Sequence, residues 1–315
     1  MEKRTVVITG GNSGLGYQCA KYIAINDKNY IVVIACRNPQ KAKNAVENLR
    51  SETGNPSIYS LGLDLASLES IRKFYYDFCK EEYPPLYGLV CNAGLSSRNT
   101  EYTKDGFELT FGVNHLGHYL LSNLLLKQMA KNGRVVFVSS DTHDPSKYFP
   151  FPAPIFTNAE RLAYPEKDGG GKNNNLMMRY TASKLCNILC TYELAARLAA
   201  ETASNITSNA FNPGFMPDTN LVPSAANPVV RVAMAGLMKP FGGLGYSQKS
   251  GKALAALITD KQYERVTGKY YDRAEEVKSS EPSYDKAAAK KLWDESAELV
   301  SLSQSETLFT VNRLK

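Results

Sequence analysis

A tyrosine and a lysine four residues apart, Tyr180 and Lys184, are the side chains of this sequence best suited to proton transfer. Residues at this spacing project from one face of a helix, which places a phenol beside an ammonium. A phenol has an ordinary pKa near ~10, and a neighbouring positive charge lowers it by favouring the phenolate. Hydride transfer to a carbonyl produces an oxyanion that needs a proton. The pair therefore predicts a general acid/base that could supply this proton. The spacing alone also fits an ordinary exposed helix, so other residues have to support this hypothesis.

A glycine-rich stretch lies between an apolar strand expected at 5–9 and a helix expected at 14–25. In that position, backbone N–H groups can approach a pyrophosphate and the helix N-terminus adds partial positive charge. The spacing is G-x-x-x-G-x-G rather than G-x-G-x-x-G, so its placement between strand and helix is the stronger indication. The residues predicted to contact a dinucleotide here are Gly10, Asn12, Ser13, Gly14, Leu15 and Gly16.

The end of the second expected strand, residues 30–36, indicates which dinucleotide binds. Arg37 follows this strand directly, and Lys41 comes within one helical turn of it. An NAD site usually has an acidic residue here for the ribose 2′-hydroxyl, whereas a guanidinium suits a 2′-phosphate. We therefore predict NADP(H) as the cofactor. The alternative is that Arg37 and Lys41 are solvated surface charges.

Two further strand ends give weaker indications of the same site. Asp64 and Leu65 end the third expected strand and could contact the adenine edge. Small residues end the fourth strand, where they would let the backbone pass close to a flat ligand. These residues are Asn92, Ala93 and Gly94.

The elements that must position these residues alternate along the chain. Short runs rich in Val and Ile predict strands buried on both faces, and the helical patterns between them predict a parallel sheet. The expected strands are 5–9, 30–36, 58–63, 86–92, 134–139, 206–212 and 267–271. The expected helices are 14–25, 39–50, 68–79, 107–131, 180–200, 252–259 and 284–300. The predicted fold class is α/β, a doubly wound parallel sheet of the Rossmann type, in a single domain over residues 1–315.

Two long excursions interrupt this alternation near the carboxyl ends of strands. Residues 141–178, which precede the expected helix of Tyr180, are rich in Pro, Gly and Asn, and residues 213–250 are again rich in loops. Long loops inside a compact domain are usually functional. We expect both to form the walls of a substrate site.

Composition narrows the classes of protein. The 315 residues carry a formal net charge of +6 without a dense Lys/Arg run, which argues against a nucleic-acid partner. Six cysteines lack C-x-x-C spacing, so we expect no metal site, reduced thiols and a cytoplasmic location. We expect neither a signal peptide nor a transmembrane segment. The apolar stretch 229–237 is too short to span a membrane; it could pack on the surface or make peripheral membrane contact.

In order and spacing, the motifs resemble the short-chain dehydrogenase/reductase family over nearly the whole chain. The residues that carry this resemblance are Thr9–Gly16, Asn92-Ala93-Gly94, Asn114, Ser139-Ser140, Tyr180-x-x-x-Lys184 and Pro213-Gly214. The resemblance implies hydride transfer by a nicotinamide cofactor to or from a small-molecule substrate.

The resemblance also implies a role for each matched residue. Ser140 would hydrogen-bond the substrate oxygen, Tyr180 would be the general acid/base, and Lys184 would lower its pKa and hold the nicotinamide ribose. Asn114 would anchor a proton-relay water. Ser139 is the alternative to Ser140, which we prefer because the catalytic hydroxyl of this family usually follows the last position of the strand. The contacts to the nicotinamide end would come from Pro213, Gly214 and Thr219.

A closer resemblance is to the branch of the light-dependent protochlorophyllide reductases and the retinol dehydrogenases. It rests on residues 114–118, 149–154, 183–187, 242–248 and 291–293. The protochlorophyllide reductases have a functional cysteine directly after the matching Pro-Gly, where this chain has Phe215, and phenylalanine cannot donate a proton.

We therefore predict an NADPH-dependent oxidoreductase that acts on a bulky hydrophobic carbonyl or alcohol. The alternatives are light-dependent C=C reduction of protochlorophyllide, and an NADP-binding protein whose catalysis is vestigial. The sequence does not decide the oligomeric state.

Overall fold

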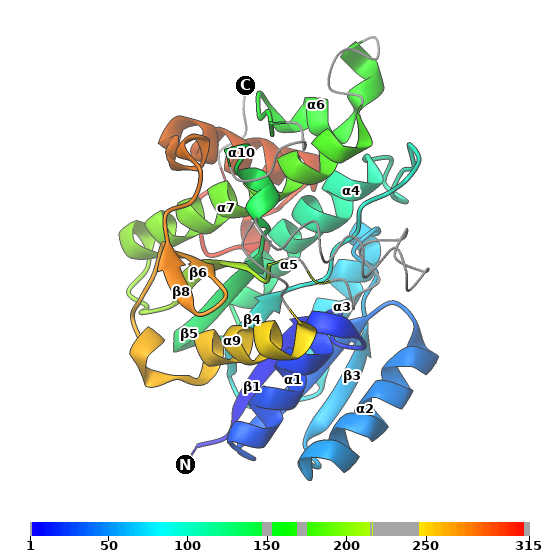
Figure 1. The fold of residues 1–315 in the computed structure, drawn as a ribbon, viewed down its shortest axis with the longest axis vertical. Helices are drawn as coiled ribbons and strands as arrows, with labels where there is room; N and C mark the ends of the chain where they lie inside the picture. Colours follow the sequence, from blue (N-terminus) through cyan, green and yellow to red (C-terminus); the bar gives the residue numbers. More distant parts are fainter. Residues whose placement is uncertain (1, 147–152, 169–174, 215, 217–245, 312–315) are drawn as a thin grey trace.

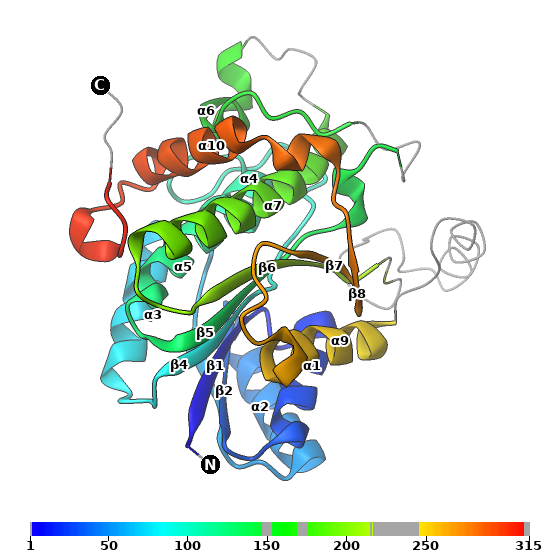
Figure 2. The ribbon, with the colours of Figure 1, turned by 90° about the vertical axis from the view of Figure 1, so that its left-hand side faces the viewer.

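The computed structural model describes residues 2–146, 153–168, 175–214, 216 and 246–311. Within these residues, an eight-stranded sheet lies between two layers of helices (Figures 1 and 2). The predicted cofactor contact Thr219, the residue Phe215 and the apolar stretch 229–237 lie outside the described residues.

The strand order is β3-β2-β1-β4-β5-β6-β7-β8, and all neighbours are parallel except β7 and β8. The order reverses between β1 and β4, and in open α/β sheets ligands bind beyond the carboxyl ends of the strands at such a point. This confirms the predicted doubly wound sheet. The strands are β1 Arg4–Thr9, β2 Tyr30–Cys36, β3 Ile58–Gly62, β4 Leu86–Cys91, β5 Met129–Val138, β6 Thr207–Asn212, β7 Tyr270–Asp272 and β8 Glu275–Val277.

Both faces of the sheet are covered, as the continuous Val/Ile runs predict. Every residue of β2 and of β4 is buried. Side chains alternate between the layers, so Val6 and Ile8 join one apolar core while Val7 joins the other. One layer contains α1 (Gly14–Asn26), α2 (Pro39–Thr53) and α9 (Ser247–Thr259). The other contains α3 (Leu68–Lys80), α5 (Gly117–Leu126) and α7 (Leu176–Glu201), with α10 (Lys286–Leu299) packed on α7.

The helix predicted at 107–131 is wrong in two respects. A short helix α4 (Leu109–Phe111) leads into a π-helical turn, Gly112–Leu116, before α5, and α5 ends at Leu126. Beyond it, Met129 already pairs with Leu86 of β4, so the start of β5 takes residues that were expected to be helical. Sheet pairing overrides the helical pattern of this short stretch.

Other boundaries move for similar reasons. The helix of Tyr180 begins one turn earlier than predicted, at Leu176, where the Asn175 side chain accepts a hydrogen bond from the Met177 N–H. The excursion before it contains the short helix α6, Ala159–Ala163, and two 3-10 turns, Asp141–His143 and Pro165–Asp168. The last expected strand is shifted to Tyr270–Asp272, and its antiparallel partner β8 was not predicted.

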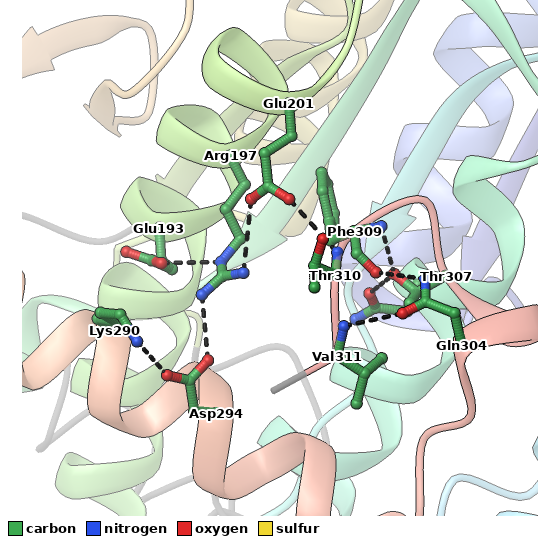
Figure 3. A network of polar contacts seen from close by, with 11 residues as sticks. Glu193, Arg197, Glu201, Lys290, Asp294, Gln304, Thr307, Phe309, Thr310 and Val311 are labelled. Atoms are coloured by element: carbon green, nitrogen blue, oxygen red, sulfur yellow. Dashed lines mark hydrogen bonds and ion pairs between the residues drawn. The ribbon is translucent and has the colours of Figure 1, made fainter. Parts of the chain in front are cut away.

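Polar contacts hold both α10 and the chain beyond it against α7 (Figure 3). Arg197 of α7 donates to Glu193 at 2.8 Å and to Asp294 of α10 at 3.1 Å. The carboxylate of Glu201, also on α7, accepts a hydrogen bond from the Thr310 N–H at 3.3 Å. These contacts hold the C-terminal half of α7, the helix that carries Tyr180.

Candidate active site

The glycine-rich loop joins β1 to α1 in a conformation that glycine makes possible. Gly10 has φ +66°, in the left-handed region that favours glycine. A Cβ atom on Gly16 would lie 2.5 Å from the Asn92 side-chain nitrogen and 2.6 Å from the Gly10 carbonyl oxygen. The loop therefore passes directly against the end of β4, which leaves room only for hydrogen at Gly16.

The N-terminus of α1 suits an anionic group. Ser13 stands at the N-cap, its side chain makes no capping hydrogen bond, and the first turn has no acidic residue. The leading N–H groups of a helix lack intrahelical partners and carry partial positive charge. Ser13 is exposed, and Asn12 and Gly14 are half-buried, so this end of the helix is accessible. The residues present fit the pyrophosphate of a dinucleotide.

Arg37 and Lys41 lie together after β2, and both are exposed. Asn38 caps α2 by accepting a hydrogen bond from the Lys41 N–H at 2.9 Å, which places Lys41 in the first turn of that helix. That turn has no acidic residue either. The position at which a carboxylate would bind a ribose 2′-hydroxyl thus carries positive charge.

The ends of β3 and β4 place the remaining predicted nucleotide contacts. Asp64 is half-buried, and its carboxylate accepts a hydrogen bond from the Ala66 N–H at 3.1 Å. Leu65 is buried against the start of α5, where a Cβ atom on Gly117 would lie 2.7 Å from its carbonyl oxygen. Asn92 donates its side-chain amide to the Thr9 carbonyl at 2.7 Å, which ties β4 to the glycine-rich loop.

Thr9 and His118 form a buried polar link that the sequence did not reveal. The Thr9 hydroxyl oxygen accepts hydrogen bonds from the N–H groups of Asn92 and Ala93, each at 2.9 Å. It also contacts Nε2 of His118 at 2.9 Å, while Nδ1 of His118 lies 3.1 Å from the Asn114 carbonyl oxygen. Burial lowers the pKa of His118 to about 4, so its imidazole is neutral. This link joins the nucleotide loop to the helix of Asn114.

Tyr180 and Lys184 both lie on α7 and are buried. The Lys184 Nζ is 5.5 Å from the centre of the Tyr180 ring and donates to the Val138 carbonyl at 3.2 Å, beside the end of β5. Ser140, which follows β5, is half-buried. Its hydroxyl donates to the Asp141 carboxylate at 3.1 Å and lies near enough to Tyr180 to lower the pKa of that phenol. The neighbouring Ser139 instead donates to the Lys184 carbonyl at 2.7 Å, so its hydroxyl serves the backbone of α7.

Asn114 lies in the π-helical turn and is fully buried. Its amide donates to the Ser183 hydroxyl at 3.0 Å and to the Leu95 carbonyl at 2.9 Å, and its oxygen accepts from the Leu95 N–H. A Cβ atom on Gly94 would lie 3.2 Å from the Asn114 side-chain oxygen and 3.5 Å from the Lys184 Nζ. The structure therefore brings Gly94, Asn114 and Lys184 into one cluster.

Pro213 and Gly214 lie at the carboxyl end of β6, where the last residue of that strand, Asn212, and Ser250 of α9 hydrogen-bond their backbone. The Asn212 side-chain oxygen accepts hydrogen bonds from the N–H groups of Asp141 and Gly214, at 3.2 and 3.1 Å. Its amide donates to Asp272 at the end of β7, at 3.2 Å. Asn212 thereby fixes the ends of β5, β6 and β7 relative to one another, a role that its type and position did not suggest.

The electrostatics of the Tyr180–Lys184 pair differ from the expectation. Burial raises the pKa of Tyr180, the nearby Asp141 carboxylate raises it further, and the Ser140 hydroxyl lowers it. Burial also lowers the pKa of Lys184 to about 8. The predicted lowering of the Tyr180 pKa is therefore not found in this structure, because the loss of water on burial has the largest effect on that pKa.

Comparisons with known proteins agree with this geometry. A family model described as short chain dehydrogenase matches residues 4–149. Retinol dehydrogenase 13 of Mus musculus is 35% identical over 307 residues, which cover 96% of this chain and 85% of that protein. The chain belongs to the short-chain dehydrogenase/reductase family.

This short-chain dehydrogenase/reductase is also similar to one further curated protein and to two solved structures. The chloroplastic protochlorophyllide reductase of Chlamydomonas reinhardtii is 34% identical over 96% of this chain and 79% of that protein. A protein of Mycobacterium paratuberculosis has a crystal structure with a TM-score of 0.70 and 29% identity, over 95% of this chain and 94% of that chain. A short chain dehydrogenase of Shigella flexneri 2a, solved in complex with NADP, shares the fold with a TM-score of 0.61 at 20% identity, over 87% of this chain and 98% of that chain.

The family uses NAD(P)(H), so this chain is an oxidoreductase of the nicotinamide-dependent class. Among the described residues, no group of His, Cys, Asp and Glu could hold a metal ion, and all six cysteines are free. Within the same ranges, no helix has the length and apolarity needed to cross a membrane.

Proposed function

We propose that this short-chain dehydrogenase/reductase transfers hydride between NADP(H) and a bulky hydrophobic carbonyl or alcohol. The observation that carries the proposal is the cluster of Ser140, Tyr180 and Lys184 at the carboxyl end of β5. This cluster lies one strand away from the end of β4, against which the glycine-rich loop packs. An acid/base pair and an anion-binding helix end are thus held at the same edge of the sheet.

The cofactor would be held by the residues of the loop and of the β2 end. Gly10, Gly14 and Gly16 would admit the pyrophosphate, and Arg37 and Lys41 would bind a 2′-phosphate. When bound, NADPH supplies the hydride, and its oxidised form brings a positively charged ring to the site. The Shigella protein that shares the fold and binds NADP supports this choice of dinucleotide.

The chain's own residues would handle the proton. In the direction of reduction, Ser140 would donate a hydrogen bond to the substrate oxygen and Tyr180 would give that oxygen its proton. The raised pKa of Tyr180 keeps its proton in place at neutral pH until the oxygen becomes basic. Lys184, with a pKa of about 8, is largely protonated at neutral pH and would bind the nicotinamide ribose. Asn114 would hold the relay water that returns a proton to this pair.

The substrate class is supported by the names of the relatives and by the excursions of the chain. Retinol is a long apolar alcohol, and retinol dehydrogenase 13 matches nearly the whole chain. The excursion 141–178 was predicted to form a wall for such a substrate, whereas most of the second predicted excursion, 213–250, lies outside the described residues.

Reduction of a ring C=C bond is the second candidate, because the Chlamydomonas protochlorophyllide reductase matches 96% of the chain. The photochemical branch carries a cysteine after its Pro-Gly, and this chain carries Phe215. We rank carbonyl chemistry first for this reason.

The test is an NADPH-oxidation assay with all-trans-retinal, a steroid ketone and an aromatic quinone, run beside protochlorophyllide under illumination. Turnover of a carbonyl in the dark, lost in Tyr180→Phe, is the expected result. Light-dependent formation of chlorophyllide would reverse the ranking of the two reactions. Failure to oxidise NADPH with any of these compounds would overturn the proposed function.

A further inference from the structure

His143, three residues after Ser140, is fully buried beside the candidate active site, and both of its ring nitrogens are engaged. We infer that His143 is a positioning residue for Ser140: it ties the backbone of Ser140 to the segment that follows β8. The inference rests on the proposed function, in which the Ser140 hydroxyl binds the substrate oxygen.

The hydrogen-bond partners fix where the proton of His143 lies. Its Nδ1 is 2.5 Å from the Ser140 carbonyl oxygen, which can only accept, so Nδ1 carries the proton. Its Nε2 accepts a hydrogen bond from the Ser280 N–H at 3.0 Å, so Nε2 carries none. His143 is therefore a neutral imidazole that bridges two backbone groups 140 positions apart in the numbering, Ser140 and Ser280.

The hydrogen bond from His143 restrains Ser140, the residue whose hydroxyl would bind the substrate oxygen. Ser140 is the N-cap of the turn Asp141–His143, and its hydroxyl oxygen accepts a hydrogen bond from the Thr142 N–H at 3.2 Å. The same turn is closed by the His143 N–H, which also donates to the Ser140 carbonyl at 3.2 Å. Side chain and backbone of His143 thus hold one carbonyl, and this fixes the peptide from which the Ser140 side chain projects.

The far end of the bridge is anchored to the helix of Tyr180. Ser283 donates to the Ser280 carbonyl at 2.5 Å and so must accept from the Ser279 hydroxyl, which lies 2.6 Å away. Because the single proton of Ser279 is used there, Tyr192 donates to Ser279 at 2.7 Å. Tyr192 lies on α7, twelve positions beyond Tyr180.

The contacts therefore connect the two elements that carry Tyr180 and Ser140. The connection runs from Tyr180 along α7 to Tyr192, through the serines to Ser280, and through His143 to Ser140. The ring of Tyr270 packs edge-on against the imidazole, with 5.0 Å between ring centres, and supports its plane. These contacts restrain the hydroxyls of Ser140 and Tyr180, which the proposed function brings to one substrate oxygen. Misplacement of such groups by about 1 Å can cost about 100-fold in rate.

Two substitutions of His143 distinguish its hydrogen bond to Ser140 from its hydrogen bond to Ser280. In His143→Asn, the side-chain amide stands where Nδ1 stood and can still donate to the Ser140 carbonyl. In His143→Gln, the amide reaches the place of Nε2, so it keeps the Ser280 contact and loses the Ser140 contact. We expect His143→Asn to keep kcat within about threefold of the wild type and His143→Gln to lose about tenfold, with KM for NADPH unchanged in both.

A double substitution tests whether the effect passes through Ser140. With all-trans-retinal and NADPH, Ser140→Ala should lower kcat by about 100-fold, as loss of an oxyanion donor does. Adding His143→Gln to Ser140→Ala should change kcat by less than about twofold, because the group that it positions is gone. Multiplied effects, or a better kcat in His143→Gln than in His143→Asn, would overturn the assignment of His143 alone. An unchanged kcat in Ser140→Ala would instead refute the role of Ser140 in the proposed function, and the role of His143 with it.

A measurement on the wild-type protein keeps the inference testable if the variants fold poorly. The chain has three histidines, so their nitrogen resonances can be resolved in an isotope-labelled sample. His143 should show the neutral form protonated at Nδ1. An imidazolium, or a proton at Nε2, would refute the bridge whatever the enzyme acts on.

Discussion

The two ends of the candidate site are built in different ways. At the cofactor end, the glycine-rich loop and the N-terminus of α1 are made by consecutive residues, and their fit depends on backbone conformation and on the missing Cβ of Gly16. At the proton-transfer end, Ser140 and Tyr180 come from elements far apart in sequence. Their relation depends on side chains such as His143 and Asn212 that bridge separate strands and loops.

This difference teaches where each function is vulnerable. Cofactor binding should be impaired by substitutions within the glycine-rich loop. Proton transfer should also be impaired by substitution of residues outside the site, such as His143 and Asn212, that bridge its elements. Only a residue that joins the two ends should disturb both, and His118 is such a residue, since it contacts Thr9 and Asn114.

The largest expected effect separates the two ends outright. Tyr180→Phe removes the proton donor and should lower kcat by about 1000-fold, within the range known for general acid/base groups. The cofactor end should be unaffected, so the Kd for NADPH, measured by quenching of protein fluorescence, should stay within about twofold. A fully active variant would remove the proposed mechanism.

The next effect breaks the cofactor end alone. Gly16→Ala forces a methyl group to within 2.6 Å of the Gly10 carbonyl, so the loop must shift and the Kd for NADPH should rise by about 100-fold. Gly62→Ala is the matched control, because nothing lies within 4 Å of a Cβ at that position. Equal Kd values for the two variants, measured by calorimetry, would contradict this account of the loop.

A smaller effect tests which dinucleotide the cofactor end selects. Arg37→Asp should weaken the binding of NADPH by about 30-fold, because the new carboxylate repels the 2′-phosphate. The affinity for NADH should stay within about threefold of the wild-type value. The readout is the ratio of kcat/KM values for the two cofactors. Equal losses for both would mean that Arg37 is only a surface charge.

The smallest expected effect concerns the link between the ends. The folded pKa of His118, about 4, lies below its ordinary 6.5, so the unfolded chain binds more protons in this interval. Stability is then complete above the unfolded pKa and declines as pH falls toward the folded one. From about pH 7 to about pH 5.5, His118 should cost about 1 kcal/mol of unfolding free energy, measured by urea denaturation. His118→Asn, which keeps a donor for Asn114 but cannot titrate, should show a shallower decline; an unchanged slope would argue against a buried neutral His118.

The sequence predicted those features that consecutive residues determine. The strands β1 to β4 and β6, the loop of Gly10 to Gly16 and the Tyr180–Lys184 pair follow from local patterns. The doubly wound topology follows from the alternation of strands and helices. The predicted start of the second helix at residue 39 also agrees with the structure, in which Asn38 caps α2 within its own turn.

The features that were missed depend on distant partners. Nothing near Met129 indicates that it will pair with Leu86, so the end of α5 was placed too late. His143 and Asn212 have no local pattern that marks them, because their partners Ser280 and Asp272 follow much later in the chain. The direction of the Tyr180 pKa was also missed, since burial is a property of the packed site rather than of the Tyr–Lys spacing.

The antiparallel strand β8 has a consequence for how the sheet ends. It adds only three residues beyond β7, and it carries the exposed glutamates Glu275 and Glu276, the second of which pairs with Lys269 at 2.6 Å. Short, charged border strands resist edge-to-edge recruitment of another polypeptide. The last hairpin therefore shields the hydrogen-bonding groups of β7 and protects this margin of the molecule from amyloid-like aggregation.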